Sequence, residues 1–154
     1  MFFYEILVTI GASIITWSFL KFMEKVALPW YEEISYKGLK IDGKWQATIN
    51  YGKQITFHED FNISQKGHRL TGAYSIKNEY SDGTSRFSTY NLEGRIINNH
   101  VTFTCFIKSQ REIGLTTFIL QITDGGDTLE GRSLWINRTG GEIECYDAYQ
   151  ISRV

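Results

Sequence analysis

Aromatic and arginine side chains are the residues of this sequence whose chemistry could hold a ligand. Flat aromatic rings stack on other flat ring systems, which is worth about 1 to 3 kcal/mol for each nucleobase, and arginine forks bind phosphate groups. The alternative is structural, because aromatic residues in a small domain mostly pack in its core and exposed arginines mostly contact water. The candidates are Tyr74, Tyr90, Trp135, Arg86 and Arg132, together with Asn137, which shares a strand face with Trp135.

One further cluster, His58-Glu59-Asp60, could bind a metal ion or transfer protons. Adjacent residues of a strand point to opposite faces, so these neighbours cannot chelate one ion together. We therefore interpret them as surface polar residues. The sequence has no Gly-x-Ser-x-Gly elbow, no phosphate-binding glycine loop and no zinc-binding helix, so we expect neither an enzyme nor a cofactor or metal.

Period-two alternation predicts that the strands carry these candidates. Trp45, Ala47 and Ile49 alternate with polar residues, which is typical of a half-buried strand. The pattern recurs between glycine- and asparagine-rich turns that supply positive φ for tight hairpins. It predicts eight strands, over residues 44–51, 55–65, 69–78, 87–98, 101–108, 115–123, 128–137 and 142–151.

A Leu-x-Gly repeat ending at Gly72, Gly94 and Gly131 indicates how these strands are arranged. Glycine inside a strand marks a bend or a close backbone approach, and glycine kinks curve a sheet towards closure. We expect an all-β, eight-stranded antiparallel meander barrel. A two-sheet sandwich is the alternative, although it usually needs longer crossovers than this chain offers.

Strand parity then orients the candidate side chains. If the leucines of the repeat point inwards, Tyr74, Tyr90, Trp135 and Asn137 point inwards too, whereas Arg132 points outwards unless a bulge re-aims it. Cys105 and Cys145 fall on apolar faces of separate strands. We interpret them as free core thiols, as expected in a reducing cytoplasm.

The N-terminal segment contains an uncharged apolar run, Ile6–Leu20, flanked by Glu5 and Lys21. We predict a transmembrane helix over residues 1–25, a juxtamembrane connector over 26–38 that contains the single proline, Pro29, and a barrel over 39–154. Lys21 and Lys25 follow the run and no basic residue precedes it. This asymmetry predicts a single-pass protein with its C-terminal domain in the cytoplasm.

Small polar residues in this helix recur at helical spacing, namely Thr9, Ser13 and Thr16. Such a face lets helices approach closely in lipid and predicts self-association. The alternative is that the hydroxyl groups bond to carbonyl groups of their own helix.

Charge in the remaining chain is balanced, with 13 Lys and Arg and 13 Asp and Glu from Leu39 onwards. A balanced domain has no basic field to attract long nucleic acid. An anionic ligand would have to be held locally.

Two resemblances follow from these features. Gly43-Lys44-Trp45 resembles the Gly-x-Trp start of the first lipocalin strand. An apolar N-terminal helix, a short connector and a compact eight-stranded barrel together resemble the SMODS-associated transmembrane β-strand-rich effectors of bacterial anti-phage (CBASS) cyclic-oligonucleotide signalling. That family's typical member has two transmembrane helices, whereas this sequence has one apolar run.

The effector resemblance implies a barrel that binds a cyclic oligonucleotide, which controls homo-oligomerisation and disruption of the bacterial inner membrane. The alternative is a membrane-anchored, lipocalin-like or structural domain for an apolar ligand or a protein partner.

Overall fold

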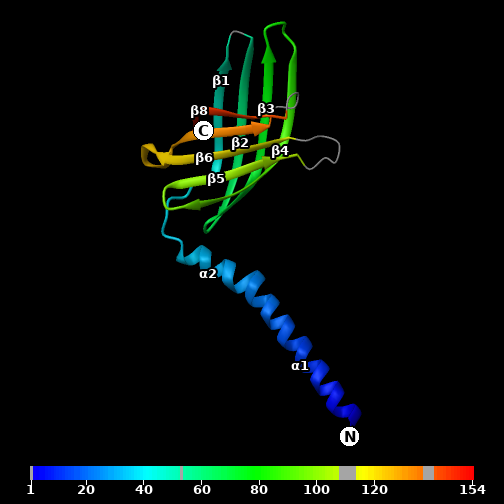
Figure 1. Cartoon of the computed structure of the whole chain (residues 1–154). Helices are drawn as coiled ribbons and strands as arrows, with labels where there is room; N and C mark the ends of the chain where they lie inside the picture. The colour runs from blue at the N-terminus through cyan, green and yellow to red at the C-terminus, as the bar shows by residue number, and fades with distance from the viewer. Residues whose placement is uncertain (1, 53, 108–113, 137–140) are drawn as a thin grey trace. The chain divides into compact units, whose positions relative to one another are not determined.

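The computed structural model describes residues 2–52, 54–107, 114–136 and 141–154. The chain divides into two compact units, residues 1–36 and 37–154. The first unit is helical and the second is a β-barrel (Figure 1).

The helical unit consists of α1 (Phe2–Phe22), a π-helical turn η1 (Met23–Ala27) and α2 (Leu28–Ser35). Pro29 stands in the first turn of α2, where its missing N–H is tolerated. The segment expected to be a connector is therefore largely helical, because this proline begins a helix rather than ending one.

The predicted transmembrane helix is corrected by this structure. A helix is present, but no helix within the described residues is both long enough and apolar enough to cross a membrane. Glu5, Lys21 and several hydroxyl-bearing residues interrupt the apolar residues of α1.

The barrel unit confirms the predicted meander. Within the described residues, eight strands follow one another and close into a barrel in which each pairs antiparallel with its sequence neighbours. The strands are β1 (Gly43–Tyr51), β2 (Ile55–Lys66), β3 (Arg69–Tyr80), β4 (Ser85–Ile97), β5 (His100–Phe106), β6 (Leu115–Thr123), β7 (Thr128–Ile136) and β8 (Ile143–Arg153). The hairpins β1–β2 and β3–β4 extend beyond the other strands (Figure 1).

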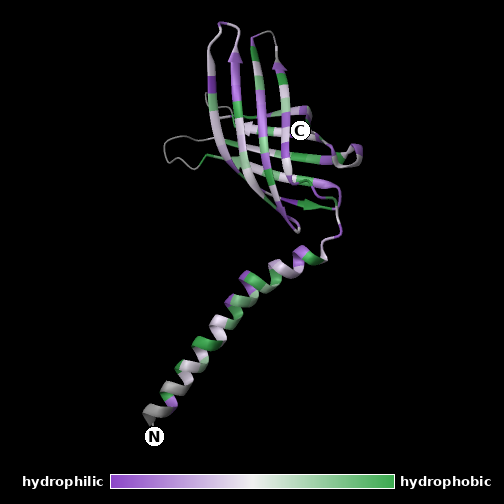
Figure 2. Ribbon diagram, turned by 180° about the vertical axis from the view of Figure 1, so that it is seen from behind, coloured by the Kyte–Doolittle hydropathy of each residue, from purple (hydrophilic) through white to green (hydrophobic). Residues whose placement is uncertain are grey.

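Hydrophilic and hydrophobic residues are interspersed along the strands (Figure 2). Burial alternates in the same way; for example, Phe61 and Ile63 of β2 are buried and Asn62 between them is exposed. The predicted hairpin turns adopt the required positive φ, for example 67° at Gly52, 56° at Gly67 and 57° at Asn98. The three repeat glycines lie where neighbouring backbones come close. A Cβ at Gly131 would overlap the carbonyl oxygen of Ile119, and those at Gly72 and Gly94 would overlap Asn62 and Thr102.

The barrel interior is layered. One end is a closed apolar core of Trp45, Leu70, Ile96 and Leu129, each completely buried. An aromatic layer lies next to it, in which Phe118 packs within 6 Å, centroid to centroid, of Phe61, Tyr74, Phe103 and Tyr149. This layer separates the closed core from a cavity in the other half.

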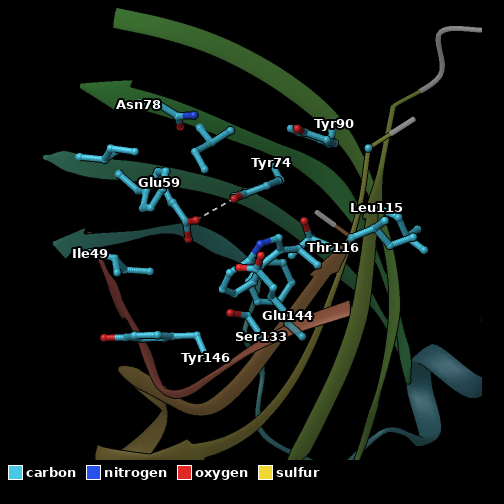
Figure 3. A pocket seen from close by; sticks show the side chains of 17 residues that line it. Ile49, Glu59, Tyr74, Asn78, Tyr90, Leu115, Thr116, Ser133, Glu144 and Tyr146 are labelled. Carbon is cyan, nitrogen blue, oxygen red and sulfur yellow. Dashed lines mark hydrogen bonds between the residues drawn. The ribbon is translucent and has the colours of Figure 1, made fainter. Parts of the chain in front are cut away.

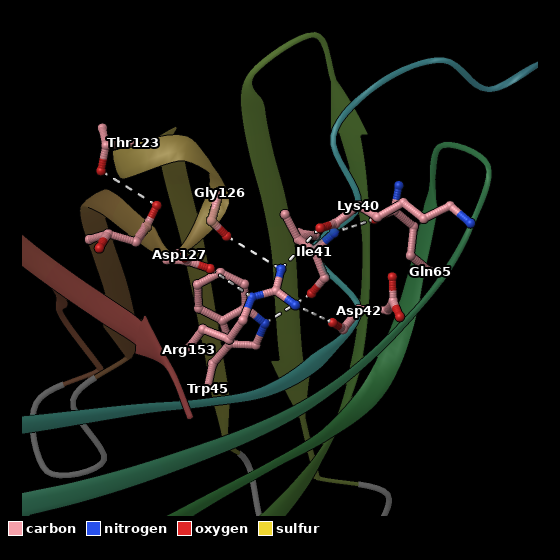
Figure 4. A network of polar contacts seen from close by, with 10 residues as sticks. Lys40, Ile41, Asp42, Trp45, Gln65, Thr123, Gly126, Asp127 and Arg153 are labelled. Carbon is pink, nitrogen blue, oxygen red and sulfur yellow. Dashed lines mark hydrogen bonds and ion pairs between the residues drawn. The ribbon is translucent and has the colours of Figure 1, made fainter.

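Polar contacts lock the closed end (Figure 4). The Trp45 indole N–H donates to the Ile41 carbonyl (2.9 Å), and the Arg153 guanidinium lies 4.8 Å from the Trp45 ring centroid. Arg153 also donates to carbonyls of Lys40, Asp42 and Gly126. The last strand and the segment before the first strand are thereby held together.

The seam between β1 and β8 is narrow. Only Trp45 with Arg153 and Gln46 with Ser152 are in register there, whereas β3 and β4 pair from Arg69 to Glu79. Beyond the seam the two strands diverge, and a groove lined by Thr48, Tyr146 and Gln150 lies between them.

Candidate functional site

The open half of the barrel holds a cavity of about 510 Å³ (Figure 3). This volume lies within the range of small-molecule sites. Ile49, Phe57, Ile76 and Leu115 supply part of its apolar wall. Its polar and aromatic wall contains Glu59, Tyr74, Asn78, Tyr90, Thr116, Ser133, Trp135, Glu144 and Tyr146.

Glu59 is a buried carboxyl group in this wall, with 7% of its surface exposed. The Tyr74 hydroxyl donates to its Oε1 (2.8 Å) and the Tyr149 hydroxyl donates to its Oε2. Burial raises the pKa of Glu59 above its ordinary value of 4.5, an effect that the two tyrosine hydrogen bonds oppose. Burial, and after it the charge of this carboxyl group, raises the pKa of both tyrosines well above 10, which keeps their hydroxyl groups protonated.

β3 and β4 present three pairs of inward-facing residues in order along the cavity. Tyr74 lies opposite Tyr90, Ile76 opposite Ser88, and Asn78 opposite Arg86. Directly opposed residues of an antiparallel pair point to the same face, and successive inward residues are about 7 Å apart. An aromatic pair, 5.3 Å apart between ring centroids, is thus followed by a small pair and then by an amide and a guanidinium group.

A β-bulge shapes the opposite wall. Gly131 pairs with Tyr149 but Ser133 pairs with Tyr146, so β8 has one residue more than β7 in this interval. Because of this extra residue, the side chains of β8 before the bulge point to the face opposite to the one that simple alternation from Tyr149 would give. Tyr146 and Glu144 therefore turn into the cavity, while Cys145 is exposed.

The inward directions predicted for Tyr74, Tyr90 and Trp135 are confirmed, because all three line the cavity. Arg86 is exposed, on the cavity side of β4. Arg132 lies outside the barrel, 66% exposed, where it forms an ion pair with Asp147 (2.9 Å). Asn137 lies outside the described residues. Ligand binding by any of these residues stays a prediction.

The hydroxyl groups of the predicted self-association face bond within their own helix. Thr9 donates to the Glu5 carbonyl (2.8 Å), Ser13 to Thr9 (2.9 Å) and Thr16 to Ala12 (2.9 Å). These are the contacts of the alternative interpretation. Self-association through this face stays a prediction.

Two predictions about polar residues were wrong. Glu59 is not a surface residue. It shares the inward parity of Phe57 and Phe61, and this signal was present in the sequence. His58 and Asp60 do contact polar side chains on the outer face. Cys145 is not a core thiol, because the β8 bulge reverses its direction. Cys105 is buried as predicted.

This lining can take up flat rings and hydrogen-bond donors. Tyrosine and tryptophan rings offer stacking surfaces, and the carboxyl groups of Glu59 and Glu144 offer acceptors. The lining includes no lysine or arginine among the described residues. Within those residues, no three His, Cys, Asp or Glu side chains converge to hold a metal ion either.

Comparison with known proteins gives no relative for this arrangement. No protein-family model matches the chain, and neither a curated protein nor a solved structure matches it significantly.

Proposed function

We propose that this protein is a ligand-controlled effector of bacterial anti-phage defence whose barrel binds a cyclic oligonucleotide. The observation that carries the proposal is the order of side chains along β3 and β4. A tyrosine pair lies deep in the cavity, and Arg86 lies on the same face towards the hairpin end of these strands. Bases would stack on the tyrosines and phosphates would contact the arginine.

The charges of the cavity restrict how such a ligand would bind. Glu59 and Glu144 belong to the lining, so a phosphate placed among them would be repelled. The exocyclic amines and ring N–H groups of bases are hydrogen-bond donors that carboxyl groups accept. The bases would therefore enter the cavity, and the phosphates would remain near Arg86.

The helical unit is the proposed output. Large apolar side chains are exposed on several sides of α1, including Ile15 (72%), Trp17 (63%) and Phe19 (60%). A helix that exposes large apolar side chains on more than one side needs an apolar partner. We propose that ligand binding controls its contact with inner-membrane lipid and with copies of itself, which would disrupt the membrane from the cytoplasmic side.

A second candidate function is favoured by the apolar wall around Ile49, Phe57, Ile76 and Leu115. A lipocalin-like carrier would bind an uncharged apolar molecule in the same space, with no role for Arg86. The two functions differ in what Arg86 does.

Calorimetric titration of the full-length protein in mild detergent distinguishes them. A panel of cyclic di- and trinucleotides is titrated into the wild type, Arg86→Gln, and the control Arg95→Gln, whose exposed side chain points outwards. We expect Arg86→Gln to weaken binding roughly 10- to 150-fold, since a charged hydrogen bond contributes roughly 1.5 to 3 kcal/mol. Arg95→Gln should leave binding unchanged. Binding of apolar probes but of no cyclic nucleotide would establish the carrier instead.

A growth assay tests the output. Expression with a cyclic-oligonucleotide synthase, compared with expression alone, should change bacterial growth, and the change should disappear when Ile15 and Phe19 are both replaced by Asn. Growth that is indifferent to the synthase would contradict the effector role.

A further inference from the structure

One polar atom of the cavity wall has no hydrogen-bond partner. Oδ1 of Asn78 is buried and accepts no hydrogen bond, and it is the only such side-chain atom within the described residues. An unpaired buried acceptor destabilises the folded state, because it has lost its hydrogen bonds to water without gaining others. If Asn78 served only to fill the cavity wall, an apolar residue at this position would make the barrel more stable.

The position of Asn78 indicates what would satisfy it. It lies opposite Phe57 on β2 and Arg86 on β4, and all three belong to the inner face. Glu59 lies one inward step deeper on β2, opposite Ile76. A group bonded to the Asn78 amide would thus lie between the tyrosine pair and the guanidinium.

The chemistry of a carboxamide narrows the partner further. Its oxygen accepts and its nitrogen donates, side by side, so its complement is an edge with one donor next to one acceptor. In protein–nucleic acid recognition, asparagine pairs in this way with the amine and ring nitrogen of adenine. The adjacent Arg86 fits the phosphate of the same nucleotide.

We propose that Asn78 is the specificity-determining residue of the cavity and that it selects a ligand with an adenine edge. This inference rests on the proposed function and names its ligand class. The Asn78 oxygen accepts from the exocyclic amine, and the amide nitrogen donates to the neighbouring ring nitrogen. The Asn78 oxygen is covered in the free barrel, so the amide turns towards the cavity as the ligand enters, and binding then supplies the missing partner.

A chemical and mutational cycle tests this inference. Cyclic di-AMP and its nebularine analogue, which lacks the exocyclic amines, are titrated into full-length wild type, Asn78→Leu and Asn78→Ala. We expect removal of the amines to weaken binding to the wild type about tenfold or more, because the Asn78 oxygen would again be unpaired. The two variants should bind both compounds equally and weakly.

Thermal unfolding gives an independent readout. Asn78→Leu removes the unpaired acceptor and should raise the Tm of the free barrel by roughly 4 °C, so weakened binding would not reflect unfolding. Asn78→Ala shows whether leucine merely blocks the cavity.

Three results would overturn the inference. Equal affinity of the wild type for the two compounds would show that the amine is not read. Unchanged affinity in both variants would remove Asn78 from the site, and preference for a guanine- or uracil-only cyclic dinucleotide would replace the adenine edge. In each case the proposed function would survive.

A different result tests the proposed function itself. If no cyclic nucleotide binds, the proposed function fails. If adenosine does not bind either, the inference about Asn78 fails as well.

Discussion

At the scale of single residues, Glu59 is a carboxyl group whose burial in the cavity wall affects how stability depends on pH. Its folded-state pKa is raised above its unfolded value, mainly by burial, so the folded protein holds this proton more tightly than the unfolded chain does. The free energy of unfolding should therefore fall as the pH rises from about 4.5 to the folded-state pKa, and this contribution should be complete at low pH.

Urea unfolding across this pH range checks the effect. Glu59→Gln should remove the downward slope, because an amide side chain does not titrate in this range. Glu130→Gln, at an exposed position on β7, is the control and should keep the slope. The same slope in Glu59→Gln would show that another group causes it.

A second residue-scale prediction concerns the tyrosine pair. Tyr90→Leu should weaken binding of a stacked base by about 1 to 3 kcal/mol, or roughly 5- to 150-fold, while the apolar contact with Tyr74 is partly kept. Calorimetric titration measures the change. Phe87→Leu, on the outer face of the same strand, should bind normally. Equal loss in both variants would indicate a distorted strand rather than a lost stacking surface.

At the scale of elements, the β8 bulge decides which cysteine is accessible. Cys145 is exposed, whereas Cys105 is buried and its thiol pKa is strongly raised by burial. We expect a maleimide to modify one thiol of the folded protein and both in urea. Cys145→Ser should abolish the reaction in the folded state. Rapid modification of Cys105 in that variant would contradict the barrel packing.

The narrow seam makes a separate prediction. The Lys44 carbonyl accepts from the Val154 N–H, so the backbone groups of Lys44 face β8. Because the direction of these groups alternates along a strand, the N–H and C=O groups of Thr48 and Asn50 also face the side of β8, which has diverged there. Their amide hydrogens should exchange faster than those of Ser75 and Ile76, since β3 is paired on both sides. Equal protection, measured by hydrogen exchange, would mean that the barrel closes along its whole length.

A structural feature can be predicted from the sequence when the residues that cause it are close together in the chain. Alternation and turn residues act within a few positions, and all eight strands and the inward direction of Tyr74 were predicted. The bulge arises from the pairing of β7 with β8, which the sequence of β8 alone does not show. A prediction from strand parity therefore misplaced Cys145 and missed Glu144 and Tyr146. Glu59 was misassigned although its parity was readable, because a charged residue is expected to face water. Pro29 marks a helix start that its neighbours do not reveal.

At the scale of the whole molecule, the interior of the barrel consists of a packed half and a half that holds the cavity. The Trp45–Arg153 network and the apolar core close one half, and the aromatic layer forms the boundary of the cavity in the other. We propose that a ligand occupies the open half without disturbing the closed half.

The four tryptophans allow one direct measurement of where a ligand binds. Trp135 lines the cavity, Trp45 lies in the closed half, and Trp17 and Trp30 belong to the helical unit. Indole N–H resonances of the full-length protein are followed by nuclear magnetic resonance while cyclic di-AMP is added. We expect the Trp135 resonance to shift to saturation and the Trp45 resonance, whose N–H is bonded to Ile41, to stay in place. A Trp135 resonance that does not move, or an equal shift of Trp45, would contradict the account.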